Sequence, residues 1–325
     1  MKLATYDDGT RDGQLWVVSR DLRRAISAVG TARTMLEALE TWDQILPRLI
    51  TVYNRLNAGE EAFAVAFDPT RCVAPLPRAP QWLDASAFLN HGRLMDKAFD
   101  NPPIPDFETI PLAYQGASDD FRGALADIEF PDDALAIDME GEFGVVLSDV
   151  PMGTTADAAS AHVRLLVQIN DWSLRALGPR EMRTGFGWLQ AKPSTAFAPV
   201  AITPDEITPY WQDNRIKLPL LVEINGREVG RANGAEMHFS FAEIIAHCAR
   251  TRKLTAGTVI GSGTVSNSDR AAGSSCISEI RVIELLDRGA CETPFLTWGD
   301  RVRMEARLPD GTAPFGVIDQ RVVRA

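Results

Sequence analysis

Two glutamates, Glu140 and Glu142, lie two residues apart in the segment IDMEGEFGVVL (137–147), whose other residues are mostly apolar and strand-prone. Successive side chains of a strand point to opposite faces, so these two carboxylates project from one face, about 6–7 Å apart at Cα. Burying two like charges side by side is costly unless a positive group neutralises them. The alternative is a solvated face of an edge strand, because charged side chains are mostly exposed. The pair therefore indicates either a buried cation site or an exposed strand face.

Two further acidic residues accompany apolar segments. Asp171 closes the run VRLLVQIND, after which a turn is expected, and Asp84 lies seven residues before His91 in QWLDASAFLNHGR. Functional residues are often placed where a rigid strand passes into a loop. Four carboxylates without Cys or clustered His suit Mg²⁺ or Ca²⁺ rather than zinc, and Mn²⁺ also accepts such ligands. The spacing is compatible with a site for a divalent cation.

Several segments together resemble the fumarylacetoacetate hydrolase family. They occur in the family's order over residues 80–290, and they are DASAFLNH, DMEGEFGVVL, INDWSLR, LQAKP and GSGTV. The N-terminal part is similar to the small domain that precedes the catalytic domain in longer members. The resemblance implies a β-rich α+β chain, with a mixed β-roll or β-sandwich-like catalytic domain at 80–325 and a small α/β domain at 1–75. It also implies a homodimer.

The resemblance further implies a metal site and a reaction. The ligands would be Asp84, Glu140, Glu142 and Asp171, so that Mg²⁺ or Ca²⁺, with Mn²⁺ as an alternative, neutralises the glutamate pair. The implied activity is hydrolytic cleavage of a carbon–carbon bond in a β-diketo acid. Fumarylacetoacetate or a related acylpyruvate would be the substrate, within the breakdown of tyrosine or of other aromatic compounds.

Four residues match catalytic groups of the family. His91 is the predicted base, because an unperturbed imidazole pKa near ~6.5 suits proton removal at neutral pH. Among the four histidines, His91 alone lies in a matching segment. Arg175 and Lys192 match the cations that surround the substrate and stabilise developing charge, although surface exposure is the usual fate of such residues. Glu279, in SCISEIR, is predicted to orient His91 as its carboxylate partner.

Four more residues match substrate contacts. Gly263 and Thr264 lie in GSGTV, which matches a turn that contacts the substrate carboxylate, and backbone N–H groups of such a turn can bind an anion. Tyr114, in LAYQGASDD, matches a tyrosine on the substrate side, and Ser86 occupies a further substrate-contact position. An ordinary turn and a half-buried packing tyrosine are the competing interpretations.

Three positions depart from the family pattern. Ser86 stands where mammalian-type enzymes carry tyrosine, Asp100 where an arginine that grips the substrate is expected, and Gly178 replaces glutamine. All three concern substrate contacts and none is a predicted metal ligand. The metal chemistry is therefore expected to be intact, while the identity of the acid is open. The Pro-rich stretch 91–121 is long enough to form a lid over the substrate.

Two other functions fit parts of the pattern. A decarboxylase or hydratase acting on a keto acid could use the same cation and carboxylates, since an enolate held on Mg²⁺ is common to all three reactions. His91 favours hydrolysis, because decarboxylation does not require activated water. A non-catalytic metal-binding protein would leave the conjunction of base, cations and metal ligands unexplained.

Composition limits the partners of the chain. The 325 residues are 45% apolar and carry a formal net charge of −11, which argues against a nucleic-acid surface. No apolar run approaches the roughly 18 residues of a membrane span, and the N-terminus has no apolar signal segment. The four cysteines are scattered without a CxxC pair, so disulfides and thiolate zinc sites are not expected. A reduced, cytoplasmic compartment fits this pattern.

Local patterns predict the main elements. The segment 2–18 predicts a β-hairpin, and helical spacing over 31–56 predicts two helices divided or started by Pro47. The Pro-rich segment 68–82 predicts a linker. Beyond residue 80, short apolar runs alternate with turns, among them a hairpin turn at Asn225-Gly226. Ser240 and Glu243 predict the capping box of a helix.

Overall fold

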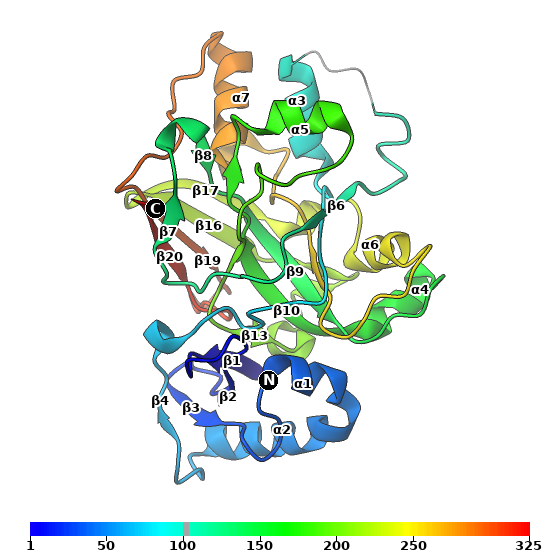
Figure 1. Ribbon diagram of the computed structural model, residues 1–325, viewed down its shortest axis with the longest axis vertical. Helices are drawn as coiled ribbons and strands as arrows, with labels where there is room; N and C mark the ends of the chain where they lie inside the picture. Colours follow the sequence, from blue (N-terminus) through cyan, green and yellow to red (C-terminus); the bar gives the residue numbers. More distant parts are fainter. Residues whose placement is uncertain (100–103) are drawn as a thin grey trace.

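Two β-sheets form the centre of the protein in the computed structural model, which describes residues 1–99 and 104–325 (Figure 1). Within these residues the larger sheet has eleven strands. Their order is β4 (Val65–Ala66), β3 (Arg24–Ser27), β2 (Gln14–Val18), β1 (Lys2–Tyr6), β13 (Ala201–Ile202), β10 (Val163–Asn170), β9 (Gly141–Leu147), β18 (Val259–Gly261), β5 (Trp82–Ala85) and β6 (Ala113–Gly116), with β12 (Ala196–Phe197) paired to β10.

A second sheet and two short ribbons complete the strands of the described chain. The second sheet has the order β17 (Arg227–Asn233), β16 (Pro219–Ile224), β19 (Arg301–Ala306), β20 (Ile318–Arg324) and β7 (Ile128–Phe130). The ribbons pair β8 (Ile137–Asp138) with β11 (Ser173–Leu174), and β14 (Trp211–Gln212) with β15 (Arg215–Ile216). Neither sheet closes into a barrel over the residues described. The predicted β-rich α+β class is confirmed.

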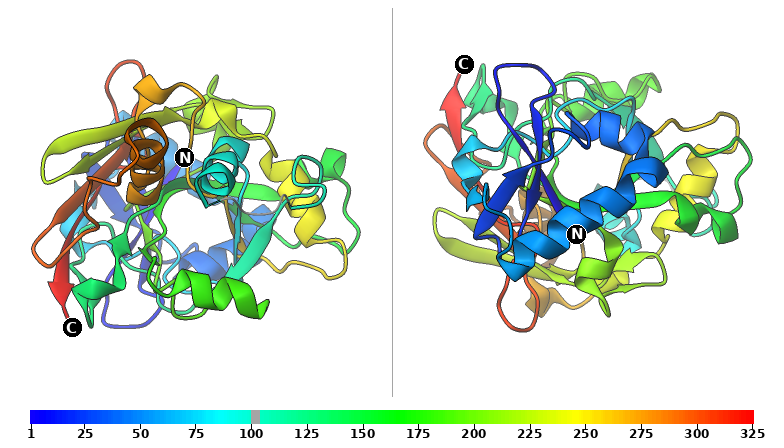
Figure 2. Two further views of the ribbon diagram at one scale, coloured as in Figure 1. Left: turned by 90° about the horizontal axis from the view of Figure 1, so that it is seen from above. Right: turned by 90° about the horizontal axis from the view of Figure 1, so that it is seen from below.

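Seven α-helices and six short 3₁₀ turns occur in the described ranges. The helices are α1 (Met35–Glu40), α2 (Trp42–Ala58), α3 (Leu89–Phe99), α4 (Ala156–Ala159), α5 (Gly178–Thr184), α6 (Phe241–Cys248) and α7 (Ile277–Arg288). The 3₁₀ turns are η1 (Pro69–Arg71), η2 (Asp133–Leu135), η3 (Ser160–His162), η4 (Pro204–Ile207), η5 (Gly234–Glu236) and η6 (Arg270–Ala272). Helices α3 and α7 pack side by side at the end of the molecule opposite the N-terminal helices (Figures 1 and 2). Among the described residues, no helix combines the length and the apolar character needed to cross a membrane.

Strands β9 and β10 form the buried middle of the larger sheet. All seven residues of β9 are buried, and β9 lies between β10 and β18. A strand covered on both faces reads as a continuous apolar run, which is why the alternation in this segment is weak. The interpretation of Glu140 and Glu142 as a solvated edge face is therefore wrong, since both are buried and Glu142 lies in an interior strand.

The N-terminal strands continue the larger sheet of the region after residue 80. The predicted hairpin is confirmed as antiparallel β1 and β2, and β1 also pairs with β13. Below this sheet lie α1 and α2, drawn in blue in Figure 2. One hydrophobic core joins Leu49 of α2 to Val146 of β9 and Val167 of β10. The division into units 1–75 and 80–325 stays a prediction, because one sheet and one core cross it.

The division of the helical region at Pro47 is wrong. The two helices meet at Thr41, whose backbone N–H and side chain both donate to the carbonyl oxygen of Glu37. Pro47 lies inside α2, on its exposed side, as the sixth residue of the helix. The Asp43 carbonyl, which loses its helical donor to the proline, belongs to an exposed residue and can bond to water instead.

The Pro-rich segment 68–82 packs against the protein along its length. Ala74 and Leu76 are buried in the core shared with α2. The Thr5 hydroxyl donates to the Pro75 carbonyl at 2.6 Å, and Val73 N–H donates to the Thr5 carbonyl at 3.0 Å. The segment therefore connects the two regions as a packed strap, and the expectation of a simple linker is corrected.

Two local predictions in the second half are confirmed. Asn225 and Gly226 both have positive φ and connect β16 to β17, as a type I′ turn requires. Ser240 and Glu243 form a reciprocal capping box at the start of α6. Asp100, where an arginine was expected, lies outside the described residues, as does part of the predicted lid stretch 91–121.

Candidate metal centre and active site

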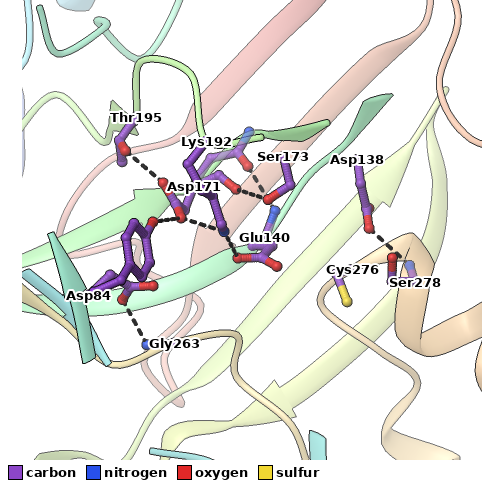
Figure 3. A network of polar contacts seen from close by, with 12 residues as sticks. Asp84, Asp138, Glu140, Asp171, Ser173, Lys192, Thr195, Gly263, Cys276 and Ser278 are labelled. Atoms are coloured by element: carbon purple, nitrogen blue, oxygen red, sulfur yellow. Dashed lines mark hydrogen bonds and ion pairs between the residues drawn. The ribbon is translucent and has the colours of Figure 1, made fainter. Parts of the chain in front are cut away.

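Four buried carboxylates converge on one point of the larger sheet (Figure 3 labels three of them). Asp84 belongs to β5 and Glu142 to β9, while Glu140 immediately precedes β9 and Asp171 immediately follows β10. One oxygen atom from each of the four lies within 4.8 Å of the other three. Two hydrogen bonds join the last two segments, from Asp171 N–H to the Glu140 carbonyl and from Glu140 N–H to the Asn170 side chain. The predicted metal-ligand set is thus spatially assembled.

Two glycines on and after β18 leave room for this convergence. A Cβ atom at Gly261 would lie 2.3 Å from Asp84 Oδ1 and 3.1 Å from Glu142 Oε2. Gly263 has φ +76°, and a Cβ there would lie 2.3 Å from the Ala85 carbonyl oxygen. Its N–H donates to Asp84 Oδ1 at 3.1 Å, so this predicted substrate contact holds a predicted metal ligand.

Glu140 and Asp171 are paired with cations. Lys192 Nζ donates to Glu140 Oε2 and to Asp171 Oδ2, each at 2.6 Å, and the Arg175 guanidinium donates to the other oxygen of Glu140. Burial alone would raise the pKa of Glu140, but Arg175 and Lys192 outweigh it and hold that pKa below its usual range. Burial likewise opposes the charge on Lys192, while Asp171 and Glu140 hold the lysine pKa above its usual range. This half of the cluster is a charge-balanced network.

Asp84 and Glu142 form the other half of the cluster. Within the described residues neither forms an ion pair with lysine or arginine, and both oxygens of Glu142 are buried without a hydrogen bond. Burial, followed by repulsion from Asp171, raises the pKa of Asp84 to about 8. Burial and the neighbouring Asp84 raise the pKa of Glu142 well above its usual range. An orphaned buried carboxylate among four oxygen donors fits a divalent cation, and these donors suit Mg²⁺, Ca²⁺ and Mn²⁺.

The loop that carries Lys192 is held by a single glutamate of α5. The Glu181 carboxylate accepts hydrogen bonds from the N–H groups of Leu189, Gln190 and Ala191, at 2.8–3.1 Å. Ala191 is buried, and its carbonyl accepts from Leu174 N–H at 2.8 Å. Lys192 therefore follows a backbone fixed on both sides, which explains how a flexible side chain keeps one position.

His91 and Glu279 form a hydrogen-bonded pair beside the cluster. The His91 Nδ1 atom lies 2.9 Å from Glu279 Oε2, across the contact between α3 and α7. An ionised carboxylate only accepts, so Nδ1 carries the proton and Nε2 is free to accept one. Ser274 Oγ donates to the second oxygen of Glu279 at 3.0 Å. The imidazole is near enough to Glu140 that its protonated form would lower the pKa of that carboxyl.

The remaining predicted residues lie around this centre. The Tyr114 hydroxyl donates to Asp171 Oδ2 at 2.6 Å, and Lys192 Nζ lies 5.6 Å from the centroid of the Tyr114 ring. Ser86 is half-buried, directly after the last residue of β5, and Thr264 is buried next to Gly263. The structure places these two beside the cluster without assigning them a contact.

Two residues of the network were not predicted from the sequence. Thr195 donates to Asp171 Oδ1 at 2.6 Å (Figure 3), and Asp138 accepts from Arg175 Nε at 2.8 Å. Asp138 could have been found, because it lies two residues before Glu140, so that three carboxylates alternate along one segment. Thr195 carried no such signal, since threonine occurs in any strand or turn.

Family models match nearly the whole chain. Fumarylacetoacetate (FAA) hydrolase C-terminal matches residues 81–323, and Fumarylacetoacetase N-terminal domain 2 matches residues 1–78. This chain belongs to the fumarylacetoacetate hydrolase family. The fumarylacetoacetase of Caenorhabditis elegans is 23% identical over 273 residues, covering 71% of this chain and 63% of its own length. An uncharacterized protein of Archaeoglobus fulgidus is 26% identical over 164 residues, 50% of this chain and 61% of its own length. The chain thus spans less than two thirds of these curated relatives.

Solved structures share the fold at low sequence identity. The crystal structure of maleylpyruvate hydrolase from Sphingobium sp. SYK-6, in complex with manganese (II) ion and pyruvate, is 14% identical and superposes with a TM-score of 0.66. The 5-carboxymethyl-2-hydroxymuconate delta-isomerase from Mycobacterium smegmatis is 16% identical, with a TM-score of 0.60. Both comparisons cover 100% of both chains. The fold of the family is therefore shared by hydrolases and isomerases.

Proposed function

We propose that this protein is a metal-dependent hydrolase that cleaves a carbon–carbon bond of a β-diketo acid. The observation that carries the proposal is the His91–Glu279 pair beside the carboxylate cluster, because it supplies a base for water where a cation could bind the substrate. The substrate class is fumarylacetoacetate or a related acylpyruvate, within the breakdown of tyrosine or of other aromatic compounds. The manganese and pyruvate in the similar maleylpyruvate hydrolase support a cation and a keto acid.

Four carboxylates are assigned to the cation in this proposal. Asp84, Glu140, Glu142 and Asp171 would hold Mg²⁺ or Ca²⁺, with Mn²⁺ as an alternative. When bound, the cation acts as a Lewis acid for the oxygen atoms of the diketo acid.

The residues of the chain then account for the proton movements. His91 Nε2 accepts a proton from water while Glu279 stabilises the resulting imidazolium through Nδ1. The hydroxide adds to the ketone carbon, the carbon–carbon bond breaks, and the departing carbon leaves as an enolate. The proton on His91 returns to that carbon, so water is divided between a carboxylic acid and a keto acid.

Lys192 and Tyr114 are assigned to the substrate side. Lys192 Nζ uses two of its three hydrogens on Glu140 and Asp171, so one remains to donate to a substrate oxygen. A cation that is already fixed stabilises developing charge without having to reorganise. Ser86, Gly263 and Thr264 are also assigned to substrate contacts. Ser86 lies two residues after Asp84, and Thr264 directly follows Gly263.

A keto-acid decarboxylase, a hydratase and an isomerase are the competing activities. A delta-isomerase is among the structures that share the fold. Isomerisation and decarboxylation consume no water, whereas a base held by a buried carboxylate partner is what hydrolysis needs. A hydratase adds water but breaks no carbon–carbon bond, so product identity separates all four activities. The proposal also includes a homodimer and a cytoplasmic location.

The decisive experiment is cleavage of fumarylacetoacetate and a panel of acylpyruvates with Mg²⁺, Mn²⁺, Ca²⁺ or a chelator. We expect chelator-sensitive formation of a carboxylic acid and a keto acid, lost in His91→Ala and in Glu140→Ala. His162→Ala is the matched histidine control, since His162 contacts Ser148 away from the cluster. A wild-type protein that binds Mn²⁺ and cleaves no member of the panel would contradict the proposal.

A further inference from the structure

Asp138 is a fully buried carboxylate that has no part in the mechanism above. It belongs to the short strand β8, whose partner strand β11 places Ser173 opposite it. Buried carboxylates are costly unless hydrogen bonds satisfy both oxygens. The question is therefore which groups Asp138 binds.

On one side, Asp138 binds the start of α7. Its Oδ1 accepts from Ile277 N–H at 2.7 Å, and its Oδ2 accepts from Ser278 N–H at 2.9 Å (Figure 3 shows the side chain beside Ser278). These are two of the N–H groups that a helix leaves without intrahelical partners. The third residue of the same helix is Glu279, the partner of His91. Asp138 therefore fixes the helical turn from which Glu279 reaches the imidazole.

On the other side, Asp138 binds Arg175. Oδ2 accepts from Arg175 Nε at 2.8 Å, and the same guanidinium donates to Glu140 in the carboxylate cluster. The planar guanidinium thus bridges two carboxylates, one of which is a predicted metal ligand. A shift of Arg175 would leave Glu140 with one cation instead of two.

We propose that Asp138 is a positioning residue that holds the carboxylate cluster and the His91–Glu279 pair in a fixed position relative to each other. One arm runs through Arg175 to Glu140, and the other through the first turn of α7 to Glu279. The inference rests on the proposed function, but its test measures geometry and metal binding instead of turnover. Failure of the hydrolase assay therefore does not decide it.

Asp138→Asn separates this role from simple packing. An asparagine has nearly the same shape, but it offers only one acceptor oxygen and replaces the other with an NH₂ donor. An NH₂ at the Oδ1 position faces Ile277 N–H, and one at the Oδ2 position faces both Ser278 N–H and Arg175 Nε. The variant therefore keeps the volume and breaks at least one arm.

The experiment combines two readouts on the full-length protein. Mn²⁺ affinity is measured by electron paramagnetic resonance, and the hydrogen-bonded Nδ1–H of His91 is followed by NMR with labelled histidine. Only four histidines occur, and His91→Gln assigns the signal. We expect Asp138→Asn to weaken Mn²⁺ binding ~10–100-fold, the usual effect of losing a residue that orients a ligand, and to shift or broaden the His91 signal.

Two further variants sharpen the result. Glu279→Gln should change the His91 signal and leave Mn²⁺ affinity within about twofold, because it touches one arm alone. Asp132→Asn, at the exposed cap of η2, should change neither readout. If Asp138→Asn does not fold, Asp138→Glu takes its place, since it keeps the charge and lengthens the side chain. A folded Asp138 variant that matches the wild type in both readouts would overturn the proposal.

Discussion

The two halves of the carboxylate cluster differ in how their charge is stabilised. Glu140 and Asp171 share Lys192, and Glu140 also binds Arg175. Asp84 and Glu142 have no ion pair within the described residues, and Glu142 has no hydrogen bond. The protein itself supplies positive charge to the first half, whereas burial raises the pKa of both carboxylates of the second half. One site therefore combines two carboxylates paired with cations of the protein and two, within the described residues, that no lysine or arginine neutralises.

Removing Lys192 should have the largest effect on folding. Lys192→Met leaves two buried carboxylates facing each other, and breaking a buried ion pair in this way costs about 3–5 kcal/mol. Urea unfolding with a chelator present measures the change. Lys217→Met, which breaks an exposed pair with Asp213, is the matched control and should leave stability unchanged. Equal effects of the two substitutions would show that the network around Lys192 adds nothing to stability.

Glu142→Gln, in contrast, should leave the metal-free protein at least as stable as the wild type. The substitution replaces a buried carboxyl whose oxygens accept no hydrogen bond within the described residues, so the free energy of unfolding of the metal-free protein should stay the same or increase. Mn²⁺ affinity should fall by roughly 100-fold, since a charged ligand is replaced by a neutral one. Calorimetric titration with Mn²⁺ and urea unfolding in chelator give the two numbers. A large loss of stability in the metal-free variant would contradict the contrast between the two halves.

Gly261→Ala tests the space in which Asp84 and Glu142 approach each other. The added Cβ would lie 2.3 Å from Asp84 Oδ1 and 2.4 Å from the Trp82 ring. We expect a loss of about 1–3 kcal/mol on unfolding, as for other overpacked sites, together with weaker Mn²⁺ binding. Gly178→Ala is the control, because a Cβ there would lie 3.6 Å from its nearest neighbour. An alanine at 261 that leaves both quantities unchanged would mean that the strands adjust without cost.

The stability of the metal-free protein should also change gradually with pH. The pKa of Asp84 is raised to about 8, above its ordinary value of about 3.9 in an unfolded chain. Between pH ~4 and ~8 the folded state therefore holds a proton that the unfolded state has released. Stability should fall as pH rises through this window, by at most about 1.4 kcal/mol per pH unit for that proton. Urea unfolding in chelator at pH 5, 6, 7 and 8 measures the slope.

Asp84→Asn is the control for this slope. The amide does not titrate, so the contribution of this position to the pH dependence should disappear. The direction of the slope is informative by itself. Carboxylates paired with cations, such as Glu140, contribute to the slope with the opposite sign, because the stability that they provide is lost as pH falls. If the metal-free protein instead gains stability from pH 5 to pH 8, Asp84 behaves like the cation-paired carboxylates.

Part of the fold follows from local pattern. The hairpin at the N-terminus, the turn at Asn225-Gly226 and the capping box at Ser240 depend on residues close in the chain, and all three are confirmed. The division at Pro47 was wrong, because an exposed carbonyl near a helix start can bond to water and the helix tolerates the proline. The packing of the strap 68–82 depends on contacts with β1 and could not be read locally.

The candidate site divides in the same way. The residue types and their alternation place Glu140 and Glu142 on one side of a segment, and the family resemblance adds Asp84 and Asp171. The roles of these residues in binding a cation stay a prediction. Asp138 lay within the same alternating segment and was overlooked, since its partners Ile277 and Ser278 are about 140 residues away.

The sequence by itself determined which carboxylates are present, how they alternate and which family the chain resembles. Only the tertiary structure decided which of them pair with Lys192 and Arg175. That outcome depends on strand order, because β18 separates β5 from β9 and its Gly261 leaves the gap in which Asp84 and Glu142 approach. It also depends on the loop that returns Lys192 to Glu140, fifty-two residues away. Local patterns describe near neighbours, whereas the charge state of a buried group is set by whatever the fold brings against it.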